Sequence, residues 1–202
     1  MFAPTFREGA RNGKRAVFSE VWTIDFKRML DNLEKRFGGS WFVCVRVHPQ
    51  LAPGTATYKN EQLHDRVIDV SQDDDMYEDL AAMDAFVTDF SSAAFDAGYA
   101  RMPVFIYADD IEQYMHERGS MLWNLSKNCP DFLTNNRTIT PGIQSILPFS
   151  ISVNNDELEK SILDFNSEEY NALLDDSLAS LGVIFDGDAS RKVVDSILQE
   201  IS

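Results

Sequence analysis

The chain has no apolar stretch that could cross a membrane and no secretory leader. Its apolar runs stay far below the roughly 20 residues that a membrane-spanning helix needs. Residues 1–3 lead directly into polar sequence, without the cationic segment and apolar core of a signal peptide. We therefore expect a cytoplasmic protein with no membrane span of its own.

Cysteine and positive charge are both scarce. The two cysteines, Cys44 and Cys129, form no metal-ligand pattern and fit a reducing compartment. With 18 basic against 33 acidic residues, the formal net charge is −15. Because nucleic-acid binding relies on a basic surface that displaces counterions, this balance argues against a nucleic-acid partner.

Some of the acidic residues cluster at positions 73–75, directly before an expected helix at 76–82. Carboxylates at the start of a helix are stabilised by its dipole, so capping is the favoured interpretation. A carboxylate trio could instead hold a metal ion. We therefore assign no metal ligand and no certain cofactor from the sequence. Binding of a divalent cation by these carboxylates is the alternative to helix capping.

Strand-like and helix-like segments alternate along most of the chain. Strands are expected near 42–47, 67–70, 85–88 and 103–106, with helices near 22–37, 76–82, 92–100 and 110–118. Residues 8–21 have the composition of a polar loop with several cations. Alternation of this kind implies parallel strands joined by crossovers. The predicted fold is α/β, with one Rossmann-like, doubly wound, mostly parallel sheet in a single domain over residues 1–202.

The end of the chain is predicted to be mainly helical. A last strand near 151–153 precedes helices near 155–164, 167–180 and 189–201. Apolar residues recur there at the spacing of a core-facing helix, and we expect them to pack: Leu158, Ile162, Phe165, Val193, Val194, Ile197 and Leu198.

Polar groups follow the apolar run at residues 85–87. Thr88 and Asp89 end this strand, and Ser91 and Ser92 open the helix that follows. A helix N-terminus carries unpaired N–H groups and a partial positive charge. The two serines could therefore cap the helix or, together with those amides, hold a pyrophosphate.

A second strand brings a cation and an imidazole to the same region. The valines of residues 42–47 lie on one face of the strand. Arg46 and His48, near its carboxyl end, lie on the opposite face. Ligands of open parallel sheets sit outside the carboxyl ends of the strands. The two strands together predict a nucleotide crevice at this edge, with a structural role for His48 as the alternative.

Further candidates lie near this edge. Thr5 and Arg7 come just beyond the expected first strand, although Arg7 could simply pair with a surface carboxylate. Arg118 ends a predicted helix, where the dipole alone favours a cation. Asp96 faces the crevice or merely occupies the first turn of its helix.

Several short motifs, in a fixed order, carry a resemblance to a known family. The chain resembles the CDP-glycerol glycerophosphotransferases of teichoic-acid synthesis, and the similarity covers most of its length. Each motif is weak alone and specific in combination: residues 3–7 (APTFR), 46–49 (RVHP), 87–92 (VTDFSS) with 95–96 (FD), 103–107 (PVFIY), 110–114 (DIEQY) with 118–119 (RG), 147–148 (LP), 154–158 (NNDEL) and 186–190 (DGDAS).

The chain departs from the family pattern in two places. Residues 120–146 replace a usually shorter segment, which bears on donor or acceptor selectivity. The family also resembles the two-domain GT-B architecture, and every motif matched here belongs to its C-terminal half. The histidine motif of the N-terminal half, thought to supply the base, has no counterpart among His48, His64 and His116. We therefore expect a donor-binding half, as a fragment or a truncated product, that does not catalyse alone.

The resemblance implies transfer of a polyol phosphate from CDP-glycerol or CDP-ribitol to a polyol-phosphate or glycan acceptor on a lipid carrier, at the inner face of the cell membrane. It assigns His48 and Arg46 to the leaving phosphate. It assigns nucleotide and diphosphate binding to Thr5, Arg7, Thr88, Asp89, Ser91, Ser92, Asp96 and Arg118. Two other functions stay open, namely the donor domain of a sugar-nucleotide GT-B glycosyltransferase and a non-catalytic Rossmann-like binding module.

Overall fold

A computed structural model describes residues 1–5, 7–11, 14–18, 23–47, 65–111, 113–114 and 147–201. The strands are β1 (Arg7–Arg11), β2 (Lys14–Phe18), β3 (Val43–Val45), β4 (Val67–Asp69), β5 (Phe86–Thr88), β6 (Val104–Tyr107) and β7 (Ser150–Ser152). The helices are α1 (Phe26–Phe37), α2 (Met76–Ala81), α3 (Ala93–Tyr99), α5 (Asn155–Leu163), α6 (Ser167–Ser180) and α7 (Ala189–Glu200).

The N-terminal segment joins β3 and β5 into one parallel sheet. The Phe2 N–H donates to the carbonyl of Cys44 at 2.8 Å, and the Ala3 N–H donates to that of Val87 at 3.0 Å. Among the described residues, the parallel neighbours therefore follow one another as β4, β3, the Phe2 segment, β5, β6 and β7. With the Phe2 segment as the first strand, this is the order 3-2-1-4-5-6 of the doubly wound nucleotide-binding fold.

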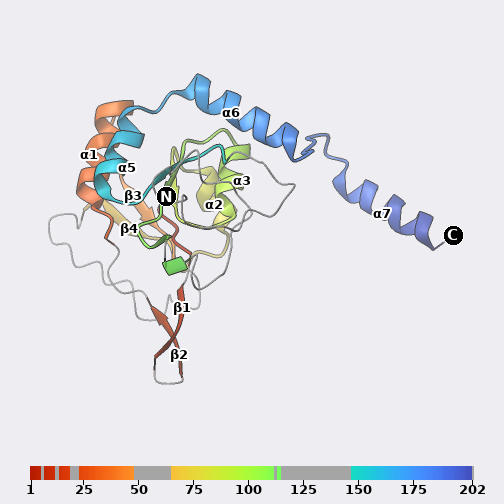
Figure 1. The fold of residues 1–202 in the computed structure, drawn as a ribbon, viewed down its shortest axis with the longest axis horizontal. Coiled ribbons are helices and arrows are strands. Elements are labelled where there is room, and N and C mark those ends of the chain that lie inside the picture. The colour runs from red at the N-terminus through yellow and green to blue at the C-terminus, as the bar shows by residue number, and fades with distance from the viewer. Residues whose placement is uncertain are drawn as a thin grey trace.

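Each face of the sheet has its own apolar core because side chains alternate along the short strands. Phe86, Val104 and Ile106 pack with residues of α2, α3 and α6, whereas Val87 and Phe105 pack with residues of α1 and α5. Figure 1 shows α1 and α5 side by side, away from α2 and α3. The predicted doubly wound α/β fold is confirmed.

The ends of α1 follow from local chemistry. The Asp25 carboxylate accepts a hydrogen bond from the Arg28 N–H at 3.0 Å, which caps the first turn. Gly38 ends the helix with φ at 76°, a conformation that glycine adopts without a steric penalty. The helix begins four residues later than expected, at Phe26 in place of residue 22.

The expectation of a polar loop over residues 8–21 is wrong for residues 8–11 and 14–18, which form strands. β1 and β2 pair in an antiparallel hairpin, with Arg7 opposite Phe18 and Arg11 opposite Lys14. The hairpin extends away from the body of the molecule (Figure 1). The intervening residues 12 and 13 read Asn-Gly, the strongest short-range hairpin signal, and it was outweighed by the polar composition around it.

The expected packing of the C-terminal helices holds for α5 and fails for α7. Leu158 and Ile162 are buried, and Phe165 packs against both cores. On α7, no residue is buried, and the side chains of Val193, Val194, Ile197 and Leu198 are between 52% and 59% exposed. The helix lies away from the rest of the molecule in Figure 1. No helix of the described residues is both long and apolar enough to span a bilayer.

Candidate functional site

Asp89 connects the two central strands where the strand order reverses. Its Oδ1 accepts hydrogen bonds from the Thr5 N–H at 2.7 Å and from the Phe90 N–H at 2.6 Å. The carboxylate is buried, with 7% of the residue exposed. Charge-assisted bonds of this kind are strong, so Asp89 holds together the chain segments that leave the Phe2 segment and β5.

Thr88 makes a second connection between the same strands. Its hydroxyl donates to the Ala3 carbonyl at 2.6 Å and is fully buried. The hydroxyl proton is thereby committed to the backbone. Thr88 and Asp89 thus hold the turn at the carboxyl edge to the Phe2 segment.

The two serines of the turn differ in their hydrogen bonds. The Ser91 hydroxyl accepts from the Ala93 N–H at 3.3 Å, which makes it a cap of α3. Ser92 occupies the N-cap position with helical backbone angles, is exposed, and makes no side-chain capping bond. Ser91 therefore acts as a helix cap. The hydroxyl of Ser92 is the one available to a ligand.

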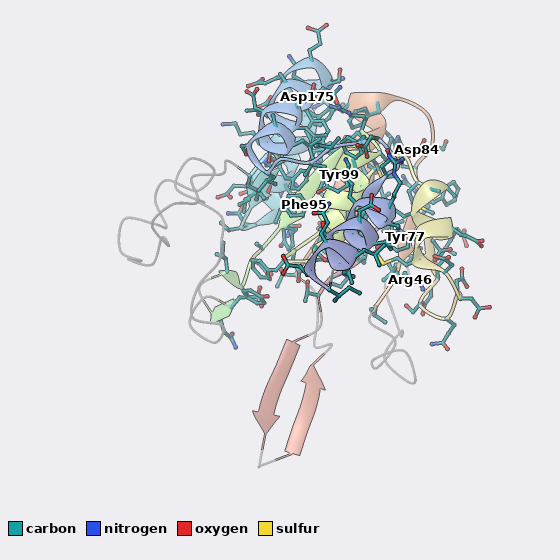
Figure 2. The ribbon with its side chains drawn as sticks, turned by 90° about the vertical axis from the view of Figure 1, so that its right-hand side faces the viewer. Arg46, Tyr77, Asp84, Phe95, Tyr99 and Asp175 are labelled. Atoms are coloured by element: carbon teal, nitrogen blue, oxygen red, sulfur yellow. The ribbon has the colours of Figure 1, made fainter. Side chains whose placement is uncertain are left out.

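Asp96, in the first turn of α3, contacts α2. The Tyr77 hydroxyl donates to Asp96 Oδ2 at 3.3 Å, and this carboxylate raises the pKa of Tyr77. Figure 2 views the face on which Tyr77 and Arg46 lie. A carboxylate and a phenol together can recognise a vicinal diol, because one accepts and the other donates.

Arg46 is engaged by protein groups. Its guanidinium forms an ion pair with Asp79 and donates to the backbone carbonyls of Val70 at 2.9 Å and Asp73 at 2.8 Å. The side chains of Arg46 and Asp79 are only 10% and 15% exposed. Arg46 thus fixes α2 and the loop after β4 against β3, and its charge is already compensated.

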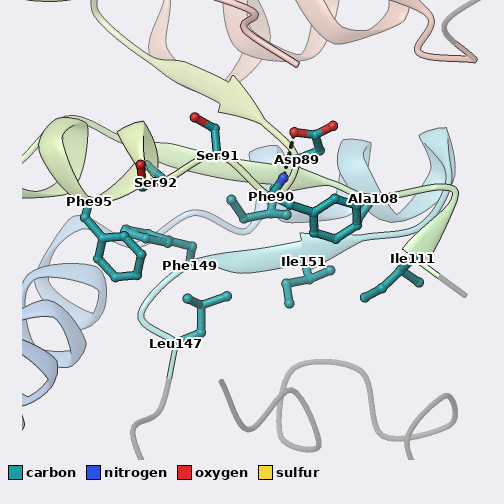
Figure 3. A pocket seen from close by; sticks show the side chains of 12 residues that line it. Asp89, Phe90, Ser91, Ser92, Phe95, Ala108, Ile111, Leu147, Phe149 and Ile151 are labelled. Carbon is teal, nitrogen blue, oxygen red and sulfur yellow. Dashed lines mark hydrogen bonds between the residues drawn. The ribbon is translucent and has the colours of Figure 1, made fainter. Parts of the chain in front are cut away.

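An apolar cavity of about 140 Å³ opens beside the serine turn. Figure 3 shows Asp89, Ser91 and Ser92 on one side of it, opposite Leu147 and Ile151. Phe90, Phe95 and Phe149 also line it. Since an apolar cavity cannot satisfy phosphate oxygens, a phosphate is better placed at the polar turn than inside it.

A polar group that sequence reasoning missed lies at the end of β6. The Thr23 hydroxyl donates to Asp109 and lies 2.8 Å from the Tyr107 hydroxyl. Burial raises the pKa of Tyr107. Tyr107 ends an apolar run just as Thr88 does, so the same rule that singled out Thr88 would have found it.

Some of the site residues predicted from the sequence lie wholly or partly outside the residues that the structure describes. His48 and Arg118 lie outside the described residues, and Arg7 is described only as the first residue of β1. Of the carboxylates at 73–75, Asp75 caps α2 by accepting from the Tyr77 N–H at 2.7 Å. Within the part of the chain described, no three potential metal ligands come together.

The parallel strand order and its reversal between the Phe2 segment and β5 define a Rossmann-like α/β fold. Residues 1–199 match the family model of CDP-glycerol:poly(glycerophosphate) glycerophosphotransferases. The chain belongs to this family.

Named relatives agree with the family. Over 201 residues the chain is 27% identical to the teichoic acid poly(glycerol phosphate) polymerase of Staphylococcus epidermidis, covering 100% of this chain and 24% of that protein. It is 28% identical over 140 residues to a teichoic acid glycerol-phosphate transferase of Staphylococcus aureus, covering 68% and 33%. The chain therefore spans a third or less of these relatives.

Solved structures of the wall teichoic acid polymerase TagF have the same fold. One matches with a TM-score of 0.56 and 26% identity, covering 99% of this chain and 42% of that one. A variant of TagF with CDPG matches with a TM-score of 0.59 and 25% identity, covering 99% and 41%.

Proposed function

We propose that this chain is the donor-nucleotide half of a polyol-phosphate transferase and binds CDP-glycerol. The observation that carries the proposal is the family match over residues 1–199, in a domain whose strand order reverses beside a serine turn. The family name specifies CDP-glycerol, and this reversal is where parallel sheets bind nucleotides.

Separate parts of the edge take separate parts of the donor. Ser92, with Ser91 and the first turn of α3, binds the diphosphate, because the hydroxyl of Ser92 makes no capping bond. Asp96 and Tyr77 take the ribose hydroxyls. Thr5, Thr88 and Asp89 hold the turn in shape through the bonds between the two central strands. Arg7 and Arg118 are the proposed additional cations for the diphosphate.

The reaction is attack by an acceptor hydroxyl on the phosphorus that carries the glycerol. A new phosphodiester bond forms, the bond to the CMP oxygen breaks, and the acceptor proton passes to a base. That base belongs to a second, N-terminal GT-B half, which contributes the acceptor site. His48 stabilises the leaving phosphate. Arg46 is a positioning residue, because its ion pair with Asp79 fixes the end of the strand that precedes His48.

The acceptor in this proposal is a polyol-phosphate or glycan chain on a lipid carrier, at the inner face of the membrane. CDP-ribitol is the second candidate donor. A teichoic acid ribitol-phosphate primase of Bacillus spizizenii is 25% identical over 118 residues, covering 58% of this chain and 28% of that protein.

Calorimetric titration of the chain with CDP-glycerol, CDP-ribitol, CMP and UDP-glucose tests the proposal. We expect weak, cytidine-selective binding, because half of a two-domain cleft leaves the ligand partly solvated. Ser92→Ala and Asp96→Asn should each weaken CDP-glycerol binding by about tenfold, the effect of one lost polar contact. Ser196→Ala, on exposed α7, is the matched control and should change nothing. Equal or tighter binding of UDP-glucose would favour a sugar-nucleotide transferase, and no binding by the folded chain would favour a non-catalytic module.

A further inference from the structure

The β1–β2 hairpin collects positive charge on an otherwise acidic chain. Residues 7–18 contain Arg7, Arg11, Lys14 and Arg15 and a single carboxylate, Glu8, whereas the whole chain has a formal charge of −15. A local excess of cations on an acidic protein creates a local positive potential.

The pairing register gathers three of these cations on one face. Positions 7 and 11 share a face of β1 because side chains alternate along a strand, and Lys14 is the register partner of Arg11. The register thus sets two residues of like charge, at positions 11 and 14, directly opposite each other. Such a pair is destabilising on its own, and an anion between the two positions would relieve it.

Both ends of the hairpin are anchored at the carboxyl edge of the sheet. Just before β1, the Thr5 N–H donates to Asp89, next to the serine turn. After β2, the Thr23 hydroxyl bonds to Asp109, just beyond the end of β6. Between these anchors the strands extend away from the body (Figure 1), and five residues of strand reach about 17 Å. A ligand on the hairpin would therefore lead towards the proposed donor site.

We propose that the β1–β2 hairpin binds the growing polyol-phosphate chain, a linear phosphodiester polyanion, and guides it towards the donor site. This inference rests on the proposed function for the identity of the polymer. Charge complementarity selects the occupant: residues 7–18 carry four cations and one carboxylate, and the polymer carries one negative charge per repeat.

The shape of the charge distribution favours a thin polymer over a membrane. The hairpin is a single pair of strands that projects from the body (Figure 1), so it offers little area to a flat anionic surface. A single flexible chain can contact the hairpin alone.

The experiment measures binding of purified poly(glycerol phosphate) to the 202-residue chain and to a triple variant, Arg11→Gln/Lys14→Gln/Arg15→Gln. The control variant, Lys27→Gln/Lys35→Gln/Lys160→Gln, removes the same charge from exposed positions of α1 and α5. We expect the hairpin variant to bind the polymer at least about tenfold more weakly. The slope of log K against log salt concentration should also be shallower by about 2, which is about 0.7 for each lost phosphate contact. The control variant should stay within about twofold of the unsubstituted chain.

Four further arms make the result decisive. Arg11→Lys/Arg15→Lys keeps the charge and should keep the affinity, which excludes a folding defect as the cause. CDP-glycerol should bind all variants alike, so a failure of the proposed donor site is visible separately from a failure of the hairpin. Equal losses in the hairpin and control variants would overturn the inference. So would preferential binding of phosphatidylglycerol vesicles, or of an oligodeoxynucleotide with the same number of phosphates.

Discussion

Helices α6 and α7 are adjacent in sequence and have opposite surroundings. On α6, Tyr170, Leu174 and Leu178 are buried against the core formed by α2, α3 and the sheet. On α7, no residue is buried, although its apolar residues are more sharply segregated to one side than those of α6. Periodicity thus shows that a helix has an apolar face, and only the tertiary structure shows whether anything covers it.

The largest effect that separates the two helices is expected at Leu174. Its side chain is completely buried, so Leu174→Ala should lower the free energy of unfolding by about 2–5 kcal/mol, through lost transfer energy and a residual cavity. Urea denaturation followed by circular dichroism measures the change. A loss below about 1 kcal/mol would mean that α6 is not part of the cooperative core.

Gly98 of α3 forms part of the surface on which α6 packs. A Cβ at this position would lie 3.0 Å from Phe149 Cε1 and 3.4 Å from Leu174 Cδ1. Gly98→Ala should therefore cost about 1–3 kcal/mol by overpacking, although alanine favours helix. The tightest contact of the added methyl group is with the Phe149 ring, so in the double variant Gly98→Ala/Phe149→Leu the two costs should sum to more than the measured loss. Simple additivity in thermal unfolding would contradict this contact.

A smaller effect is expected at Tyr170, whose hydroxyl donates to the Met102 carbonyl at 2.7 Å. Tyr170→Phe should cost about 1 kcal/mol, the net value of a typical hydrogen bond. Burial raises the pKa of Tyr170 above its ordinary value of 10. The unfolded chain therefore loses this proton first, and stability falls as the pH rises beyond 10.

The pH dependence gives Tyr170 a second readout. In Tyr170→Phe, the decline of the unfolding free energy above pH 10 should be less steep than in the unsubstituted chain. Identical slopes in chemical denaturation across this pH range would show that the Tyr170 hydroxyl is accessible to solvent.

The smallest effect is expected on α7. Because the Ile197 side chain is 55% exposed, Ile197→Ser should change the free energy of unfolding by less than about 0.5 kcal/mol. The measurement is the same urea denaturation as for Leu174. A loss comparable to that of Leu174→Ala would show that α7 packs in solution, and the contrast between the two helices would then be void.

The sequence predicted the parts of the fold that local patterns determine. The short apolar strands at residues 86–88 and 104–107 are bounded by polar and turn-forming residues, and the alternation with helices implied parallel pairing. The pairing of Phe2 with both Val45 and Val87 is non-local, yet the position of the opening motif in the family pattern anticipated a first strand there. The hairpin was missed because Asn12-Gly13 is a two-residue signal within a cationic stretch.

The position of the serine turn was predictable from the sequence, whereas its contacts were not. The serine turn follows β5 as expected, but the sequence left open which serine caps α3. The partner of Arg46 is Asp79, 33 residues further along the chain, and no local pattern indicates that pair. Tyr77 became a candidate only through its contact with Asp96, which depends on how α2 and α3 pack.

Amide hydrogen exchange of the chain, with and without CDP-glycerol, tests the central claim most directly. It reports in one measurement where the donor binds and which helices are packed. We predict added protection in residues 88–97, at the serine turn and the first turns of α3, with no change in α7 and none when UDP-glucose replaces CDP-glycerol. Protection confined to α7, or unchanged exchange at residues 88–97 under saturating CDP-glycerol, would contradict the assignment of the donor site to the carboxyl edge of the sheet.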